Sequence, residues 1–335
     1  MTVTSFRVDA NPDAGLGHFH RSVRIASELA RRGHRPVFVT RDREALARLA
    51  VGQGFDHIVG FAEDKDEINA ILSPGPGLVI FDNGSTTHDM VAAVKEVGCF
   101  VVTFDDLGDG RYLADIAVDA NLTESTNPQK MRTTTRYLLG PGFAVVSPHC
   151  RTARKKRKNF RDVHRVIVSC GGSDPAGVTP RIVMALGNYD TEVEIQLILG
   201  PAFAHRAELD KALLSAARTF EVVEAPDDLP TRLRAADVGI LSGGVTLFEA
   251  AFLGLPSIVI AQNPAQLRNL PPFEKRGGIV NLGLAAHEPF ANIPAELKLL
   301  RDRGKLRAMS EAQETYVDGK GLDRVVSAIR ELLGT

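Results

Sequence analysis

The sequence contains no tryptophan and only three cysteines, and aromatic residues make up 6% of it. So few aromatic side chains argue against stacking platforms for single-stranded nucleic acid. Cys99, Cys150 and Cys170 lie far apart and form no CxxC pair, so neither a disulfide framework nor a zinc site is expected. We therefore expect buried free thiols, no metal and no cofactor.

The sequence also lacks long hydrophobic runs and an excess of charge. No stretch reaches the roughly 18 apolar residues of a membrane-spanning helix, and no basic segment precedes the first apolar run. The net charge of −1 gives no overall attraction to nucleic acid or to anionic membranes. These absences predict a cytoplasmic protein whose partner is a small molecule. They leave the oligomeric state open.

What the chain does contain is a regular alternation of short apolar runs and amphipathic segments. This pattern is typical of parallel sheets covered by helices. In the first half, strands are predicted at 5–8, 36–40, 57–59, 77–81, 100–104 and 116–118, with helices at 22–32, 43–49, 65–72 and 90–97. In the second half, strands are predicted at 165–169, 194–199, 220–223, 238–242, 257–260 and 279–281, with helices at 179–186, 203–217, 229–235, 247–253, 267–275, 295–300, 304–313 and 322–333.

The alternation is interrupted at 151–165, where eight Lys or Arg accompany one acidic residue. A patch for nucleic acid is one interpretation of this stretch, and a solvated linker is the other. Because 335 residues exceed what one core usually holds, we predict two Rossmann-like α/β domains facing each other across a cleft. Their predicted bounds are 1–150 and 165–315, with a basic linker at 151–164 and a final helical segment at 316–335 that packs back on the first domain.

The most informative segment is GLGHFHR at 15–21, between the first strand and the first helix. Gly15 and Gly17 let the backbone approach a ligand, and a helix start favours anions. His18 supplies an imidazole, the side chain most often used for acid–base chemistry. A tight turn and a surface histidine remain the alternatives.

Two further glycine loops follow strands in the second half. Gly171, Gly172 and Ser173 follow the strand at 165–169, and Gly243 and Gly244 follow the strand at 238–242. Both loops are candidate cradles for a diphosphate, since helix-start N–H groups face such loops. Neither a Walker nor a GxGxxG pattern is present. Simple strand-to-helix turns are the alternative.

Several polar residues lie near these loops. Glu249 is placed one turn into the following helix, where its carboxylate could accept hydrogen bonds from vicinal ribose hydroxyls. Alternatively, it is an acidic residue that the helix dipole stabilises near the helix start. Gln266 and Asn269 suit sugar hydroxyls or act as caps. In the first half, Asp82 and Asp105 each follow a strand. They are expected near His18, where they either orient the imidazole or cap turns.

Short motifs recur in a definite order: GxGHxxR at 15–21, FDDL at 104–107, DAN at 119–121, LLGP at 138–141, GGSD at 171–174, SGGxTxxE at 242–249 and GxP at 254–256. Together they resemble the UDP-sugar hydrolases of pseudaminic acid biosynthesis, which extend to spore-coat polysaccharide proteins and belong to the GT-B superfamily. The segment from residue 242 is also similar to the UDP-binding half of a murein glycosyltransferase, whose pattern ends in a Gln and an Asn like Gln266 and Asn269.

This resemblance implies metal-independent cleavage of a UDP-linked deoxy amino sugar of the 2,4-diacetamido-2,4,6-trideoxy-hexose type. It implies His18 and Asp82 as catalytic residues, with His18 activating water. The binding residues it implies are Gly15, Gly17, Arg21, Asp105, Gly171, Gly172, Ser173, Ser242, Gly243, Gly244, Thr246, Glu249, Gln266 and Asn269.

The chain differs from the resembled pattern at two places that would touch the sugar. Gly84 stands where the family has a tyrosine two residues after the aspartate, and the segment after residue 260 is lengthened. The sugar, the acceptor and the pathway product therefore stay open. A glycosyltransferase with a UDP-sugar donor is the second hypothesis, and a non-catalytic nucleotide-sugar-binding protein is the third.

Overall fold

The computed structural model describes residues 2–9, 16–51, 53–55, 57–121, 134–155, 162–189 and 192–335. Gly15 lies outside these ranges, as do residues 156–161 of the predicted basic linker. The chain divides into two compact units, Met1–Val145 with Lys320–Thr335, and Val146–Gly319. The first unit thus ends a few residues before the predicted boundary at 150, because a short helix at Pro148–Ala153 (α5) belongs to the second.

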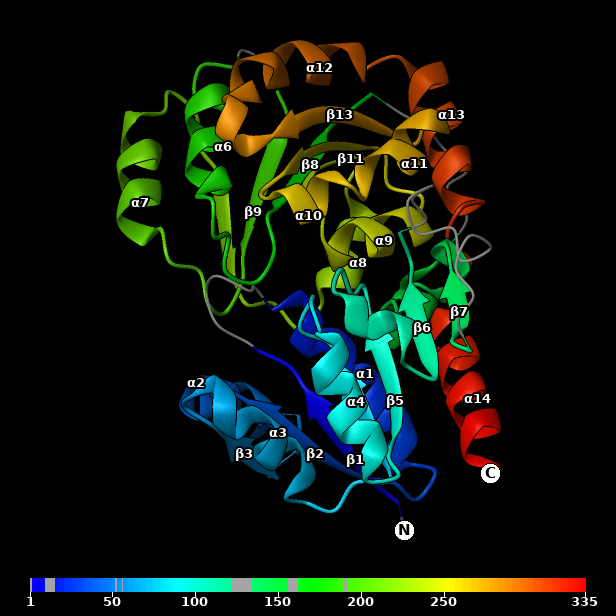
Figure 1. Cartoon of the computed structure of the whole chain (residues 1–335). Coiled ribbons are helices and arrows are strands. Elements are labelled where there is room, and N and C mark those ends of the chain that lie inside the picture. Colours follow the sequence, from blue (N-terminus) through cyan, green and yellow to red (C-terminus); the bar gives the residue numbers. More distant parts are fainter. Residues whose placement is uncertain are drawn as a thin grey trace. The chain divides into compact units, whose positions relative to one another are not determined.

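The first unit is built on a seven-stranded parallel sheet (Figure 1). Its order is β3 (Ile58–Gly60), β2 (Arg35–Thr40), β1 (Val3–Arg7), β4 (Leu78–Phe81), β5 (Phe100–Phe104), β6 (Ile116–Asp119) and β7 (Arg136–Leu139). The chain order reverses between β1 and β4. In open parallel sheets, ligands bind beyond the carboxyl ends of the strands at such a point.

Helices cover both faces of this sheet. On one face, α1 (Gly17–Ala30) places Phe19 against Phe38, which stacks on Phe6. The helix at the end of the chain, α14 (Gly321–Leu333), packs against α1. On the other face, α3 (Asp64–Leu72) and α4 (His88–Glu96) bury apolar side chains against β4 and β5. A nine-residue helix, α2 (Arg43–Val51), links β2 to β3.

The second unit repeats this plan with a six-stranded parallel sheet. Its order is β10 (Glu221–Glu224), β9 (Glu194–Leu199), β8 (Arg165–Ser169), β11 (Val238–Ser242), β12 (Ser257–Ala261) and β13 (Ile279–Leu284). Its order reverses between β8 and β11. Besides α5, its helices are α6 (Val178–Leu186), α7 (Arg206–Ser215), α8 (Leu229–Ala235), α9 (Val245–Phe252), α10 (Pro264–Leu267), α11 (Leu270–Lys275), α12 (Ile293–Leu299) and α13 (Arg303–Glu314). The two parallel sheets confirm the predicted pair of Rossmann-like domains.

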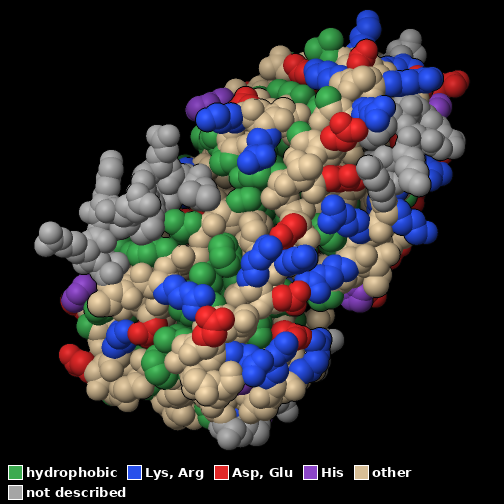
Figure 2. All heavy atoms as spheres, turned by 90° about the vertical axis from the view of Figure 1, so that its right-hand side faces the viewer, with side chains coloured by type: hydrophobic (Ala, Val, Ile, Leu, Met, Phe, Trp, Pro, Cys, Tyr) green, Lys and Arg blue, Asp and Glu red, His purple; other side chains and the backbone are tan. Residues whose placement is uncertain are grey.

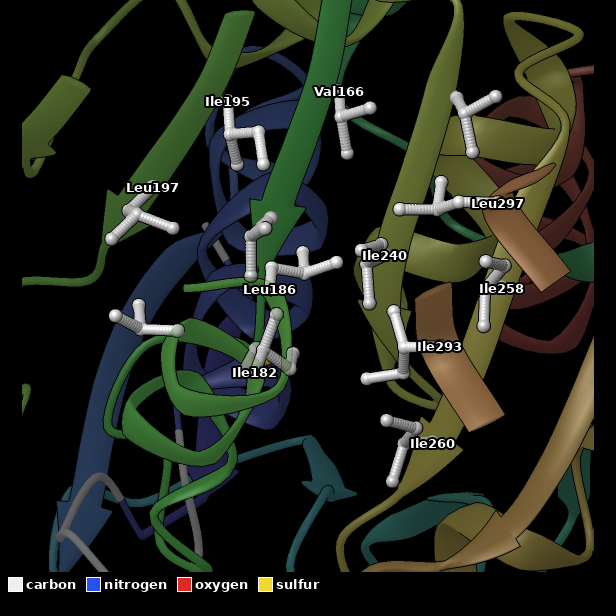
Figure 3. Close-up of a cluster of buried hydrophobic side chains, with 14 of the residues drawn as sticks. Val166, Ile182, Leu186, Ile195, Leu197, Ile240, Ile258, Ile260, Ile293 and Leu297 are labelled. Carbon is white, nitrogen blue, oxygen red and sulfur yellow. The ribbon is translucent and has the colours of Figure 1, made fainter. Parts of the chain in front are cut away.

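The core of the second unit lies between the sheet, α6 and α12 (Figure 3). Ile182 and Leu186 of α6 and Ile293 of α12 are fully buried against branched side chains of the strands. Burial of such side chains contributes about 1.5–3 kcal/mol each. This core fixes the strands whose ends carry the glycine loops.

Several local predictions were wrong or incomplete, among them the start of the helix predicted at 22–32, which begins at Gly17. The helix predicted at 267–275 is split into α10 and α11, because Pro271 and Pro272 are tolerated only in the first turn of a helix. The strand β7 and the helix α5 were not predicted. The predicted helix at 203–217 begins only at Arg206.

The surface mixes charges of both signs. On the face drawn in Figure 2, Lys and Arg side chains lie interspersed with Asp and Glu. Within the described ranges, every helix is too short or too polar to cross a membrane.

Candidate functional site

The first candidate site lies at the carboxyl ends of β1 and β4. Leu16 is the N-cap of α1, and Gly17 is its first residue, so His18 stands in the first turn of that helix. Asp82 directly follows β4, and its N–H donates to Arg7 O of β1 at 2.9 Å. Because β1 and β4 are neighbours in the sheet, the topology brings His18 and Asp82 together.

His18 and Asp82 form a hydrogen-bonded pair. His18 Nδ1 lies 2.7 Å from Asp82 Oδ1. Arg21 Nη2 is 3.2 Å from the same nitrogen, but a nitrogen that donates to a carboxylate cannot also accept, and the shorter contact decides. The proton therefore sits on Nδ1, which leaves Nε2 as an acceptor. The imidazole is 31% exposed, whereas Asp82 is fully buried.

Asp82 is the centre of the cluster. Besides His18, it accepts from Arg21 Nε at 2.9 Å, Arg21 Nη2 at 2.5 Å and Ser22 Oγ at 3.1 Å. Burial alone would raise the pKa of Asp82, but the charge and hydrogen bonds of Arg21, together with His18, outweigh it and lower the pKa to about 2. Asp82 is thus a fixed anion that orients His18.

Arg21 is directed into the protein. Its guanidinium also donates to Asp105 and lies over the Phe104 ring. Burial disfavours the charged form, but Asp105 and Asp82 together raise the pKa of Arg21. Sequence analysis placed Arg21 against the ligand. The structure gives it two carboxylate partners, the buried Asp82 and the half-buried Asp105, and binding of the ligand by Arg21 stays a prediction.

The two aspartates after β5 behave differently. Asp106 accepts from Thr86 N, Thr86 Oγ1 and Gly108 N, so it holds a turn. Asp105 faces Arg21 and stands near the end of β6, where Asp119 lies. Sequence reasoning noted Asp119 only as part of a motif. Its proximity to Asp105 depends on the pairing of β5 with β6.

The second candidate site lies at the carboxyl ends of β8, β11 and β12. Gly171 has a φ of 88°, a left-handed conformation that favours glycine. Gly172 lies so close to Gly200 that a Cβ at position 200 would overlap its backbone. Ser173 is buried. Asp174 accepts from Val178 N and Thr179 N at 2.9 and 2.8 Å, so its carboxylate already caps α6.

The loop after β11, which leads into α9, differs from the loop after β8. Ser242 and Gly243 are buried, whereas Gly244 and Thr246 are half-buried. Gly244 is the N-cap of α9 and supplies no side-chain cap. A Cβ at Gly244 would meet only Gln266 Nε2, at 3.8 Å. The start of α9 therefore offers accessible backbone and the positive end of a helix dipole, which suit an anion.

Neutral amides connect these loops. Gln262 Nε2 donates to Cys170 O at 2.5 Å, and Gln262 Oε1 accepts from Ala176 N at 3.1 Å. Gln266 Oε1 accepts from Gln262 N at 3.0 Å, and Asn269 Nδ2 donates to Gly243 O at 2.7 Å. Gln266 and Asn269 thus lie beside the glycine loop as expected, with one group of each engaged by the protein. The role of Gln262 was not predicted.

Glu249 is buried on α9, and its Oε1 accepts from Ser147 N at 3.1 Å. This bond occupies an oxygen that was predicted to bind ribose. Binding of ribose by Glu249 therefore stays a prediction. Among the described residues, no group of three or more His, Cys, Asp or Glu is arranged to hold a metal ion.

No family model matches the chain. It is 26% identical over 268 residues to the uncharacterized protein MJ1062 of Methanocaldococcus jannaschii, a match that covers 77% of this chain and 55% of that protein. The chain thus spans about half the length of that relative. It is 23% identical over 331 residues to the spore coat polysaccharide biosynthesis protein SpsG of Bacillus subtilis, covering 97% of this chain and 96% of SpsG.

Solved structures share the fold over nearly the whole chain. The UDP complex of Staphylococcus aureus MnaA has a TM-score of 0.68 at 14% identity, covering 100% of this chain and 97% of that one. Acinetobacter baumannii MurG has a TM-score of 0.67 at 13% identity, covering 99% and 100%. The calicheamicin glycosyltransferase CalG4 has a TM-score of 0.62 at 17% identity, covering 100% and 98%. The chain has the GT-B fold of two Rossmann-like domains.

Proposed function

We propose that this protein is a nucleotide-sugar hydrolase that cleaves a UDP-linked deoxy amino sugar to UDP and the free sugar. The observation that carries the proposal is the hydrogen bond of 2.7 Å between His18 Nδ1 and Asp82 Oδ1. A histidine oriented in this way is equipped to take a proton from a nucleophile through Nε2.

In the proposed reaction, His18 takes a proton from water as the water oxygen attacks the anomeric carbon. The bond from that carbon to the diphosphate oxygen breaks, and UDP leaves with the electron pair. Asp82 stabilises the imidazolium that forms, because it is a buried anion at neutral pH. Arg21 and Ser22 hold Asp82 in place.

The second unit supports binding of the diphosphate. Gly244 leaves the start of α9 accessible, and a Cβ at Gly171 would lie 3.8 Å from Ser242 Oγ. Backbone N–H groups at a helix start meet the charge that develops on a departing diphosphate. The similarity to SpsG over 97% of the chain, and to a structure solved with UDP, supports a nucleotide-sugar ligand.

A glycosyltransferase is the second candidate, and the likeness in fold to CalG4 favours it. The same histidine could deprotonate a hydroxyl of an acceptor instead of water. Incubation with UDP-sugars, with and without candidate acceptors, separates the two functions by following UDP and free sugar. Release of UDP only when an acceptor is present contradicts hydrolysis.

The variant His18→Ala tests the base. Loss of a general base is expected to lower kcat by about 10²–10⁴-fold, while UDP binding measured by calorimetry is unchanged. His88→Ala is the matched control, because His88 is 60% exposed on α4. Equal turnover of His18→Ala and wild type rules out His18 as the base. A wild type that binds but never turns over supports the third hypothesis, a non-catalytic nucleotide-sugar-binding protein.

A further inference from the structure

The side chain of Gln262 bridges the two ends of the glycine loop that follows β8. Its Nε2 donates to Cys170 O at 2.5 Å, and its Oε1 accepts from Ala176 N at 3.1 Å. Cys170 directly follows β8, and Ala176 lies two residues before α6. One primary amide thus meets the loop with a donor and an acceptor, as the peptide group of a neighbouring strand would.

The order of the strands gives this bridge its importance. Gln262 directly follows β12, and β11 lies between β8 and β12 in the sheet. Since neighbouring strands are about 4.8 Å apart, the contact between Gln262 and Cys170 spans the end of β11. The loop from Ser242 to Gly244 begins at that strand end. The bridge thus lies where the two glycine loops leave the sheet.

Other bonds hold the middle of the first loop. Gly172 O accepts from Ala202 N at 3.0 Å, and Asp174 O accepts from Gly177 N at 2.9 Å. Ala202 follows β9, which lies on the other side of β8 from β11 and β12. The loop is therefore held from the β9 side by Ala202 and from the β12 side by Gln262. A loop that is fixed before the ligand arrives loses less conformational entropy on binding.

The main chain of Gln262 orients a second amide. Its N–H donates to Gln266 Oε1 at 3.0 Å, and because an N–H group can only donate, the atom it meets is the oxygen of that amide. The donor end, Nε2, is directed elsewhere, and a Cβ built at Gly244 would lie 3.8 Å from it. Gly244 is the N-cap of α9. Gln266 thus presents N–H groups beside a helix start, which favours anions.

We propose that Gln262 is a positioning residue that joins the two glycine loops into one anion site. Its side chain fixes the loop of residues 170–176, and its N–H turns the donor end of Gln266 toward Gly244. Gln262 holds these groups in place and does not itself contact the ligand. That the anion is the diphosphate of a nucleotide sugar rests on the proposed function, whereas the joining of the loops does not.

The bridge is tested first without a ligand. Gln262→Met keeps the length of the side chain and removes both of its hydrogen bonds. Hydrogen exchange of the Ala176 N–H, followed by NMR, is expected to be about tenfold faster in this variant, as the loss of one hydrogen bond allows. Gln53→Met, at an exposed glutamine of the first unit, should leave that rate unchanged. Equal exchange rates in Gln262→Met and wild type overturn the proposal.

The joined site is then tested by calorimetry with UDP. Gln262→Met is expected to bind UDP about tenfold more weakly, because the loosened loop must be ordered on binding. A role in stability alone would lower the melting temperature of Gln262→Met and leave its affinity for UDP unchanged, and this result overturns the proposal. A wild type that binds no UDP, with the exchange result as expected, contradicts the proposed function and supports the joining of the loops.

Gln262→Glu supplies a readout that packing alone does not. The ionised carboxylate cannot donate to Cys170 O, whereas the protonated acid carries an O–H in the place of Nε2. A carboxyl that faces a carbonyl oxygen and an anion also takes up a proton more readily than in water. Relative to wild type at the same pH, UDP binding by Gln262→Glu should be about tenfold weaker near pH 8 and should recover near pH 5. An equal deficit at both pH values overturns the donor role of Gln262.

Gln266→Glu tests the orientation of the second amide. One carboxylate oxygen can still accept from Gln262 N, while the other replaces the donor beside Gly244. The affinity for UDP is expected to fall about 100-fold, because like charges then face each other. Binding of UDP by Gln266→Glu as tight as by wild type overturns the orientation and with it the joined site.

Discussion

The carboxyl ends of the strands form one edge in each of the two sheets. These two edges share a strand topology but differ in the residues that lie there. At the ends of β1, β4 and β5, charges meet: the buried Asp82 and the half-buried Asp105 converge on Arg21. At the ends of β8, β11 and β12, glycines and neutral amides hold the loops together, and the buried carboxylate of Asp174 accepts from N–H groups of α6. The first edge therefore depends on charge pairing and the second on close approach of backbones. The same strand order thus carries a charge-paired edge in one unit and a glycine-rich edge in the other.

The largest effect on stability is expected from removing the guanidinium of Arg21, the cation at the edge of the first sheet. Arg21→Met leaves Asp82 buried without its main partner, which should lower the free energy of unfolding by about 3–5 kcal/mol, as measured by urea denaturation. Arg31→Met is the control, since Arg31 is 67% exposed and surface changes stay within about 0.5 kcal/mol. Adding Asp82→Asn to Arg21→Met should recover part of the loss. Equal effects of Arg21→Met and Arg31→Met would contradict the importance of buried pairing.

At the second edge, two glycine variants separate packing from binding. Gly200→Ala places a Cβ against the backbone of Gly172, and such overpacking should cost about 1–3 kcal/mol. Gly244→Ala meets nothing closer than 3.8 Å, so its stability should match wild type while its affinity for UDP falls. Thermal unfolding and calorimetry measure the two effects. If Gly244→Ala binds UDP as wild type does, the start of α9 is not the anion site.

The pH dependence of stability should have opposite signs at the two edges. The pKa of Asp82 is lowered from 3.8 to about 2, so its contribution is present above pH 4 and is lost as pH falls toward 2. That contribution is about 2 kcal/mol. Burial raises the pKa of Asp174 above 3.8 despite its bonds to α6, so its contribution is present below pH 3.8 and lost as pH rises.

Denaturation of Asp82→Asn, Asp174→Asn and wild type between pH 2 and 7 measures this difference. Relative to wild type, Asp82→Asn should lose the decline below pH 4, and Asp174→Asn should lose the decline above it. Parallel curves for the two variants would show that the edges do not differ in this way.

The smallest effect is expected from an amide of the second edge. Asn269→Ala removes the bond to Gly243 O and should cost about 1 kcal/mol, read from thermal unfolding. Asn281→Ala is the control, because its bond to Glu274 is exposed. A loss at Asn269 no larger than at Asn281 would mean that the amide does not hold the glycine loop.

Hydrophobic patterning predicted most of the fold. The strands β8, β9 and β11 match their predicted bounds because branched apolar residues make up most of each, in the sequences RVIVS, EIQLIL and VGILS. The strand β7 was missed because its sequence RYLL contains no β-branched residue. The helix α5 was missed because basic residues dominate its region, although Pro148 is well suited to a helix start.

Only those features of the candidate site that follow from the order of the strands could be predicted from the sequence. The meeting of His18 and Asp82 follows from adjacent strands β1 and β4, which a parallel sheet implies. Other features depend on side-chain packing between elements distant in sequence. They are the sharing of Arg21 between Asp82 and Asp105 and the bridge made by Gln262. Binding roles for the individual residues stay predictions.

The return of the chain to its first unit has a consequence for synthesis. The chain leaves that unit at Val145 and comes back at Lys320, and α14 buries Val325 and Ile329 there. A ribosome must therefore complete all of Val146–Gly319 before α14 can cover α1. At about 5–20 residues per second, the nascent first unit exposes this apolar surface for many seconds. During that interval it is open to chaperones, while the second unit, one continuous stretch, is free to fold first.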